Sequence, residues 1–170
     1  MRICTIGHGT RPIVELIECL QKGGVRTLVD VRRFPGSRRN PQFNRAALEA
    51  SLEHSGIAYR HAVDLGGRRS GIPGEDRFDC LPAFAGYAAW MTTEQFGEAL
   101  DQALGAPSPC LMCAESVPWR CHRLLVADLL TARGHDVLHL LRPHEARPHR
   151  LSDVAEARGG RLYLCGSLVA

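Results

Sequence analysis

Apolar segments with β-strand character alternate along this chain with amphipathic helical segments, and this alternation restricts the fold more than any other feature. Strands are expected at residues 2–6, 26–31, 57–61, 110–114 and 136–141. Helices are expected between Thr10 and Gly23 and at residues 45–55, 83–91, 92–104 and 121–133, with Thr10, Asn44 and Thr92 as caps. Strands that alternate with helices pair in parallel through right-handed crossovers. The sequence therefore predicts an α/β fold, a three-layer sandwich with a mostly parallel, doubly wound sheet.

The chain is expected to form a single α/β domain over residues 1–170, because it contains no internal repeat, low-complexity tract or linker. The tail at residues 143–170 has weaker signals, with one last strand expected at 162–165. No stretch approaches the roughly 18 to 20 apolar residues of a membrane helix. Residues 1–7 have strand character rather than the pattern of a signal peptide. We therefore expect a cytoplasmic protein without a membrane partner.

The seven cysteines are odd in number and lack the spacing of a disulfide framework. In a chain without an export signal, this pattern argues against structural disulfides. Cys110 and Cys113 spell C-x-x-C, but residues three apart in a strand point to opposite faces of the sheet. The two thiols are therefore expected neither to share a metal ion nor to join, and Cys110 is expected in the core.

Nearly every cation of the chain is an arginine, with Lys22 as the only lysine. A GC-rich coding bias explains this abundance, and so does recognition of phosphate or carboxylate by guanidinium groups. Several of these cations, and one histidine, come after predicted strands: His8, Arg32, Arg33, Arg68 and Arg69. The carboxyl ends of strands form the edge where open parallel sheets bind ligands. Position therefore favours an anion-binding site at this edge.

The segment at residues 113–123 reads Cys-Ala-Glu-Ser-Val-Pro-Trp-Arg-Cys-His-Arg. Cys113 lies where a strand becomes a loop, and Cys121 lies at the start of the next helix. Backbone amides at a helix N-terminus and nearby arginines stabilise a thiolate. The segment is therefore the strongest candidate for the chemistry of this protein.

Four interpretations of this segment remain open. Both cysteines could be buried core thiols. Cys113 could be a reactive thiolate beside an anion-binding loop, although its distance in sequence from Arg120 does not match the short loop of cysteine phosphatases. Cys113, Cys121 and His122, together with His8 or Glu115, could bind zinc or iron, without a familiar ligand spacing. Glu115 and His122 could act as an acid–base pair on a bound substrate.

The polar loop at residues 32–44 interleaves arginines with Phe34 and Phe43. This pattern is typical of surfaces that bind single-stranded nucleic acid through phosphates and base stacking. Asp30, inside the preceding strand, is expected to orient Arg32. The polar face of the loop offers Arg32, Ser37, Arg38 and Arg39.

Together these segments resemble the family of the domain of unknown function 488. The resemblance covers most of the chain and rests on Thr5-Ile6-Gly7-His8, on Val29-Asp30-Val31-Arg32 with Pro35, Ser37, Arg38 and Phe43, on Leu65-Gly66-Gly67, and on Cys113-Ala114-Glu115 followed by Cys121-His122-Arg123. It implies a Rossmann-like α/β sandwich and signature residues at His8, Asp30, Arg32, Ser37, Arg38, Glu115, Cys121, His122 and Arg123, with Cys113 at the first cysteine. Gly9 departs from the serine common in the family, and the tail beyond Arg150 is individual. The family name states no activity, so the reaction stays open.

The sequence favours an enzyme, or a degenerate relative of one, that handles a small phosphorylated or nucleotide-like anion. The expected catalytic residues are Cys113, Glu115 and His122. The expected ligand-binding residues are His8, Asp30, Arg32, Ser37, Arg38, Arg68 and Arg123. A zinc or iron cofactor would use Cys113, Cys121 and His122. The alternative is a nucleic-acid-binding or processing module that uses the arginine loop at 32–44, and a purely structural role is the third possibility.

Overall fold

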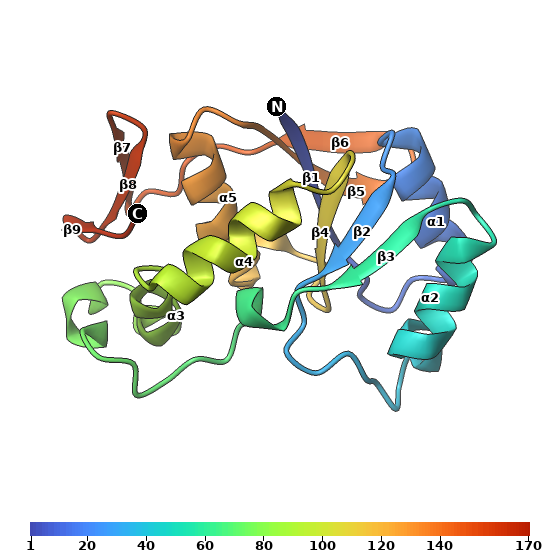
Figure 1. The fold of residues 1–170 in the computed structure, drawn as a ribbon, viewed down its shortest axis with the longest axis horizontal. Helices are drawn as coiled ribbons and strands as arrows, with labels where there is room; N and C mark the ends of the chain where they lie inside the picture. Colours follow the sequence, from blue (N-terminus) through green and yellow to red (C-terminus); the bar gives the residue numbers. More distant parts are fainter.

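A six-stranded sheet with the order β3-β2-β4-β1-β5-β6 forms the centre of the computed structural model, which describes residues 1–170 (Figure 1). Five strands are mutually parallel: β1 (Arg2–Gly7), β2 (Thr27–Asp30), β3 (Ala58–His61), β4 (Pro109–Cys113) and β5 (Asp136–Arg142). The edge strand β6 (Glu145–Pro148) runs antiparallel to β5. The predicted α/β class with a mostly parallel sheet is therefore confirmed.

Helices pack on both faces of this sheet (Figure 1). One face carries α1 (Ile13–Lys22) and α2 (Arg45–Glu53), and the other carries α3 (Ala85–Trp90), α4 (Glu94–Leu104) and α5 (Arg123–Ala132). Alternate side chains of a strand point to opposite faces, so Cys110 packs in the α1–α2 cluster whereas Cys113 packs in the α5 cluster. The predicted separation of these two thiols is confirmed. None of the helices is long and apolar enough to cross a lipid bilayer.

Of the three predicted helix caps, Thr10 and Thr92 are wrong, and Asn44 is confirmed in position as the residue that directly precedes α2. Thr93 rather than Thr92 caps α4, because its Oγ1 accepts a hydrogen bond of 3.2 Å from the backbone N–H of Phe96. Thr92 instead donates, at 2.8 Å, to a carbonyl near the end of α3. Thr10 and Asn44 form no side-chain capping bond with the helices that follow them.

The tail forms more regular structure than the sequence predicts. The last predicted strand corresponds to β8 (Arg161–Leu164), which pairs in a three-stranded antiparallel sheet with β7 (Ala155–Arg158) and β9 (Ser167–Leu168). The buried leucines of β8 join the hydrophobic cluster around α5. The missed strands β6, β7 and β9 have two to four residues each, too few for a detectable periodic pattern.

A disulfide between Cys80 and Cys165 joins the loop before α3 to the end of β8. The prediction that the chain contains no structural disulfide is therefore wrong. The two cysteines are 85 residues apart, and only the packing of the tail beside α3 and α5 brings them together. The other five cysteines are free and buried.

The double variant Cys80→Ser/Cys165→Ser is expected to have a free energy of unfolding lower by up to about 4 kcal/mol, because this cross-link restricts a long loop of the unfolded chain. Denaturant unfolding followed by circular dichroism measures the difference. Wild-type protein treated with a reductant should unfold with the variant, and Cys19→Ser should keep its sensitivity to reductant. Titration of seven rather than five thiols in unreduced, denatured protein would contradict the assignment.

Candidate functional site

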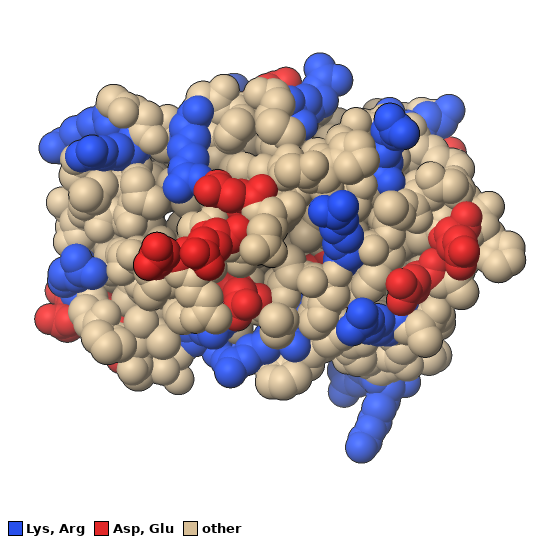
Figure 2. Space-filling view, viewed as in Figure 1, with Lys and Arg blue, Asp and Glu red and all other residues tan.

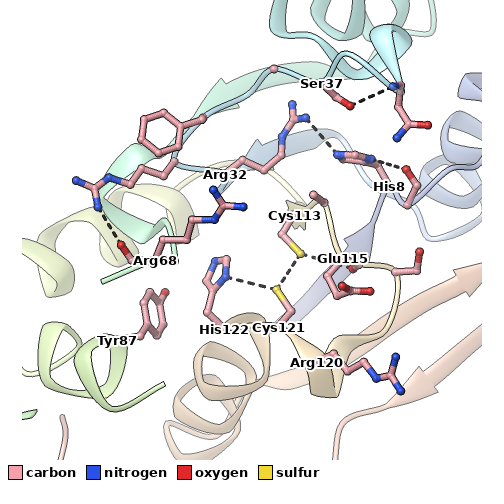
Figure 3. A pocket seen from close by; sticks show the side chains of 18 of the residues that line it. His8, Arg32, Ser37, Arg68, Tyr87, Cys113, Glu115, Arg120, Cys121 and His122 are labelled. Atoms are coloured by element: carbon pink, nitrogen blue, oxygen red, sulfur yellow. Dashed lines mark hydrogen bonds between the residues drawn. The ribbon is translucent and has the colours of Figure 1, made fainter. Parts of the chain in front are cut away.

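A pocket of about 720 Å³ lies at the carboxyl ends of β1, β2 and β4 (Figure 3). Segments far apart in the sequence meet there, as the strand pattern predicts. The predicted site residues that line the pocket are His8, Arg32, Ser37, Arg68, Cys113, Glu115, Cys121 and His122. Asp30 and Arg123 are buried outside the lining, and Arg38 lies on the exposed loop, away from the pocket.

Two cysteines form the chemical centre of this pocket. Cys113 ends β4, and Cys121 follows a short 3-10 helix, Pro118–Arg120, that leads into α5. Their Sγ atoms are 2.9 Å apart (Figure 3). The Arg123 Nε donates to the Cys113 Sγ at 2.8 Å, and the Arg123 backbone N–H donates to the Cys121 Sγ at 3.5 Å. The two sulfurs therefore share a cationic, hydrogen-bonding environment.

The hydrogen bond between the two thiols shifts their pKa values in opposite directions. The hydrogen bond from the Cys113 thiol lowers the pKa of Cys121, and the contacts with His122 and Arg123 lower it further. Burial and the same inter-thiol hydrogen bond raise the pKa of Cys113. One negative charge is therefore stabilised on the pair, while the second proton is retained. A thiolate is the form in which cysteine acts as a nucleophile.

Arg123 is buried beside the two sulfurs and does not line the pocket. Only 1% of its surface is exposed, and its guanidinium bonds to groups of the protein. Besides its bond to Cys113, the guanidinium donates from Nη2 to the Glu115 carbonyl at 2.5 Å and from Nη1 to the Thr5 Oγ1 at 3.4 Å. These contacts fix its position beside the sulfurs.

His122 lies beside the thiol pair, with its Nδ1 3.4 Å from the Cys121 Sγ and its ring edge-on to Tyr87. Its Nε2 is buried without a hydrogen-bond partner. A Cβ atom at Gly67 would lie 2.7 Å from the His122 Nδ1, so any side chain at this position would displace the imidazole. The absence of a side chain at Gly67 thus allows the backbone of the Gly66-Gly67 motif to lie close to the His122 ring.

Asp30, Arg32 and His8 form a second buried cluster on the pocket wall. The Arg32 Nε and Nη2 donate to the two Asp30 carboxylate oxygens at 2.8 and 2.6 Å. The Arg32 Nη1 lies 3.2 Å from the His8 Nε2, and Tyr59 donates to Asp30 at 2.9 Å. These bonds leave two of the five guanidinium N–H groups free. Arg32 therefore anchors the pocket wall and has limited capacity for a ligand.

His8 is held as a neutral ring. Its Nδ1 lies 2.9 Å from the Gly9 carbonyl, so this nitrogen carries the proton and Nε2 accepts from Arg32. The ring stacks on Phe43. Burial lowers the pKa of His8 from 6.5 to about 4, and the Arg32 charge acts in the same direction. Both ring nitrogens are therefore occupied within the protein.

Exposed arginines provide the available positive charge around the pocket. Arg68 extends toward the thiol pair, whereas Arg120 points away from the sulfurs (Figure 3). The guanidinium groups of both form no hydrogen bond or ion pair with the protein. Arg33 donates to the Arg68 carbonyl at 3.0 Å and lies near the exposed Phe34 ring. Glu115 is the only carboxylate among the lining residues, and it is exposed.

Ser37 contributes to the shape of the arginine loop. Its backbone N–H donates to the Asn44 Oδ1 at 2.6 Å. Because the Asn44 side chain is used here, it forms no capping hydrogen bond with the backbone of α2. Its Oγ accepts from the Asn40 N–H at 3.0 Å. A ligand that uses the Ser37 hydroxyl would therefore share it with the loop backbone.

The arrangement does not support the suggested zinc or iron site. No group of three or more His, Cys, Asp and Glu side chains is placed to hold a metal ion. Cys113, Cys121 and His122 are neighbours, but the Arg123 guanidinium lies 2.8 Å from the Cys113 sulfur. A cation beside these sulfurs would be repelled by the positive charge already there.

Sequence patterns missed two aromatic residues of the pocket, Phe84 and Tyr87. Both lie near the start of a short apolar helix, where the composition indicates only core packing. The Tyr87 hydroxyl donates to the Leu65 carbonyl at 2.8 Å and so ties α3 to the glycine motif. Nothing in the local pattern distinguishes this tyrosine from an ordinary core residue.

Comparison with known proteins gives one match. The family described as domain of unknown function DUF488 matches residues 12–130. No curated protein and no solved structure matches the chain at a significant level.

Hydrogen peroxide is expected to join Cys113 to Cys121. The Cys121 thiolate attacks peroxide, releasing hydroxide and forming a sulfenic acid, and the Cys113 thiol then displaces water from it to form the disulfide. Peptide mapping by mass spectrometry should detect the cross-link with the loss of two hydrogens. Cys110→Ser, on the opposite face of the sheet, should form the same product. Accumulation of sulfinic acid without a cross-link would contradict this prediction.

Acid is expected to destabilise the protein through its neutral buried histidines. Burial lowers the pKa values of His8 and His139 to about 4, so between pH 6.5 and 4 the unfolded state binds protons that the folded state does not. Stability is therefore complete above pH 6.5 and falls as the pH decreases, by about 1.4 kcal/mol per pH unit for each histidine. Denaturant unfolding at several pH values should show a smaller decrease in His8→Gln than in wild type. An equal decrease in both would contradict the assignment.

Proposed function

The chain belongs to the DUF488 family of domains of unknown function, and we propose that it is an enzyme that acts on a small phosphorylated or nucleotide-like anion. The observation that carries this proposal is the pocket, which combines the Cys113–Cys121 pair with Arg68 and Arg120, whose guanidinium groups have no protein partner. A low-pKa thiol beside unpaired cations is typical of catalytic sites rather than of a packed core.

The walls of the pocket suit a phosphorylated ligand. The guanidinium groups of Arg33, Arg68 and Arg120 offer paired donors that match phosphate oxygens. Phe34 is 66% exposed at the pocket, and its ring offers an apolar face for a base or sugar. The volume of about 720 Å³ is within the usual range for small-molecule sites.

The thiol pair suits nucleophilic chemistry. In the proposed step, the Cys121 sulfur attacks an electrophilic carbon or phosphorus of the substrate and forms a covalent bond to it. The bond to the leaving group breaks with its electron pair, and the leaving group takes a proton from solvent. Glu115 is the carboxylate that accepts the proton of the attacking water in the hydrolysis that follows. Hydrolysis or transfer to an acceptor then releases the thiolate. Cys113 stabilises the nucleophile by hydrogen bonding, and His122 is the adjacent imidazole.

A nucleic-acid-binding function is the second candidate. Arg38 and Arg39 are exposed on the loop outside the pocket, together with Phe34. Figure 2, however, shows Lys and Arg side chains on the viewed face scattered among acidic ones, without a continuous stripe. Binding along a phosphate backbone requires an extended basic track. The charge distribution on this face therefore favours the small anion.

We also propose a layer arrangement for the fold and a cellular location for the protein. A doubly wound, Rossmann-like three-layer sandwich is supported by helices on both faces of the parallel sheet. A cytoplasmic location agrees with the five free thiols, since a reducing compartment keeps such thiols available, whereas the Cys80–Cys165 disulfide is a bond typical of an oxidising compartment.

Inorganic phosphate and a nucleoside monophosphate are expected to protect Cys113 and Cys121 from iodoacetamide. The double variant Arg33→Gln/Arg68→Gln should require at least about tenfold more ligand for the same protection, since each lost charge-assisted hydrogen bond contributes about 1.5–3 kcal/mol. Peptide-resolved alkylation rates measure the effect. Arg158→Gln, on β7 and outside the pocket, is the matched control and should behave as wild type.

Absence of protection at millimolar ligand would overturn the anion proposal. Filter binding of single-stranded DNA and RNA over a salt series then tests the second candidate. A steep loss of affinity with salt, reduced in Arg38→Gln/Arg39→Gln but not in Arg33→Gln/Arg68→Gln, would establish nucleic-acid binding by the loop instead.

A further inference from the structure

A polar chain, a continuous series of buried polar side chains, leads from the thiol pair along the α5 face of the sheet. It begins with the bond of 3.4 Å from the Arg123 Nη1 to the Thr5 Oγ1. The Thr5 Oγ1 lies 2.7 Å from the His139 Nδ1, and the His139 Nε2 lies 3.0 Å from the His149 Nδ1. The His149 Nε2 lies 2.9 Å from a carboxylate oxygen of Asp128, which is the last residue of the polar chain. All five side chains are at most 6% exposed.

The polar chain starts and ends on the same helix, α5. Arg123 and Asp128 belong to α5, while Thr5 on β1 and His139 on β5 are paired directly in the parallel register. His149 follows the edge strand β6. The polar chain therefore connects α5, the centre of the sheet and the tail, which are far apart in sequence.

The two ends of the polar chain have fixed hydrogen-bond roles. A carboxylate only accepts, so the His149 Nε2 carries a proton, and a guanidinium only donates, so the Thr5 Oγ1 accepts from Arg123. With a neutral His149, its Nδ1 is an acceptor, and the His139 Nε2 donates to it. The His139 Nδ1 then accepts from the Thr5 hydroxyl.

The environment supports this assignment. Burial lowers the pKa of His139 to about 4, so this ring is neutral at pH 7. Asp128 also accepts from the Ser152 backbone N–H at 2.9 Å and from its hydroxyl at 2.7 Å. The Asp128 carboxylate, the acceptor at the end of the polar chain, is therefore fixed in position.

We propose that Thr5, His139, His149 and Asp128 are positioning residues that hold the Arg123 guanidinium on the Cys113 sulfur and so maintain the charge of the thiol pair. This inference deepens the proposed function and rests on the pair being its reactive group. The Nη1 of a buried guanidinium requires an acceptor, and Thr5 supplies it. Without an acceptor there, the guanidinium rotates and its bond to sulfur weakens. Simple packing would not require five polar groups in an apolar cluster.

Other titratable groups also face the sulfurs. His122 precedes α5, Tyr87 approaches from α3, and Glu115 and Arg68 lie on the pocket wall. Substitution of Thr5 leaves all four of these in place. A change in thiol titration after substitution of Thr5 therefore reports on Arg123.

The test compares Thr5→Val, which removes the hydroxyl at nearly constant volume, with Thr5→Ser, which retains it. The pH profile of iodoacetamide alkylation, resolved for the peptides of Cys113 and Cys121, is the measurement. Thr5→Val is expected to move the midpoint of the profile upward by about one pH unit, which corresponds to a tenfold change in ionisation. Thr5→Ser is expected to match wild type. His139→Phe should move the midpoint upward by less, because it only releases the orientation of the Thr5 hydroxyl.

Two controls separate positioning from general destabilisation. Leu52→Ala, in the opposite hydrophobic cluster, should lower the melting temperature without moving the alkylation profile. Nitrogen NMR of the wild-type imidazoles needs no variant and should find the Nε2–H tautomer in both His139 and His149 from pH 6 to 8. A wild-type profile in Thr5→Val, or an Nδ1–H or charged ring in the NMR experiment, would overturn the proposal. Failure of ligand protection with a shifted Thr5→Val profile would instead reject only the proposed function.

Discussion

The burial of one guanidinium group is the constraint on which the rest of the site depends. A cation removed from water is stable only when its N–H groups are paired with acceptors. For Arg123 these acceptors are the Cys113 sulfur, the Glu115 carbonyl and the Thr5 hydroxyl. They come from the end of β4, the loop after it and the middle of β1. Satisfying this one side chain therefore holds the thiol pair at the carboxyl edge of the sheet.

A second buried arginine has a similar effect on the other side of the pocket. Arg32 is paired with Asp30 and contacts His8, so the chain leaves β2 in a fixed direction toward the arginine loop. The exposed Arg33 and Arg68 then project from a rigid wall. The arginines of this chain thus divide into buried ones that determine geometry and exposed ones that are available to a ligand. The fold therefore determines their different roles.

Local patterns predicted much of the fold and of the candidate site. The alternation of strand residues placed Cys110 and Cys113 on opposite faces, because that period depends only on neighbouring residues. The parallel topology implied that residues after strands meet at one edge, and they do. Roles that depend on distant partners were not predictable. Arg123, for example, was expected to bind a ligand, but it is buried and does not line the pocket.

The amino-acid sequence by itself determined the order of strands and helices, the α/β class and the set of polar residues at the carboxyl edge, because these follow from periodicity and strand direction. Only the tertiary structure decided which of those residues are satisfied within the protein and which are free. It also decided the pairing of Cys80 with Cys165 and the polar chain that ends at Asp128. Hydrogen bonds and disulfides between distant segments depend on distances that exist only after packing, so no local pattern encodes them.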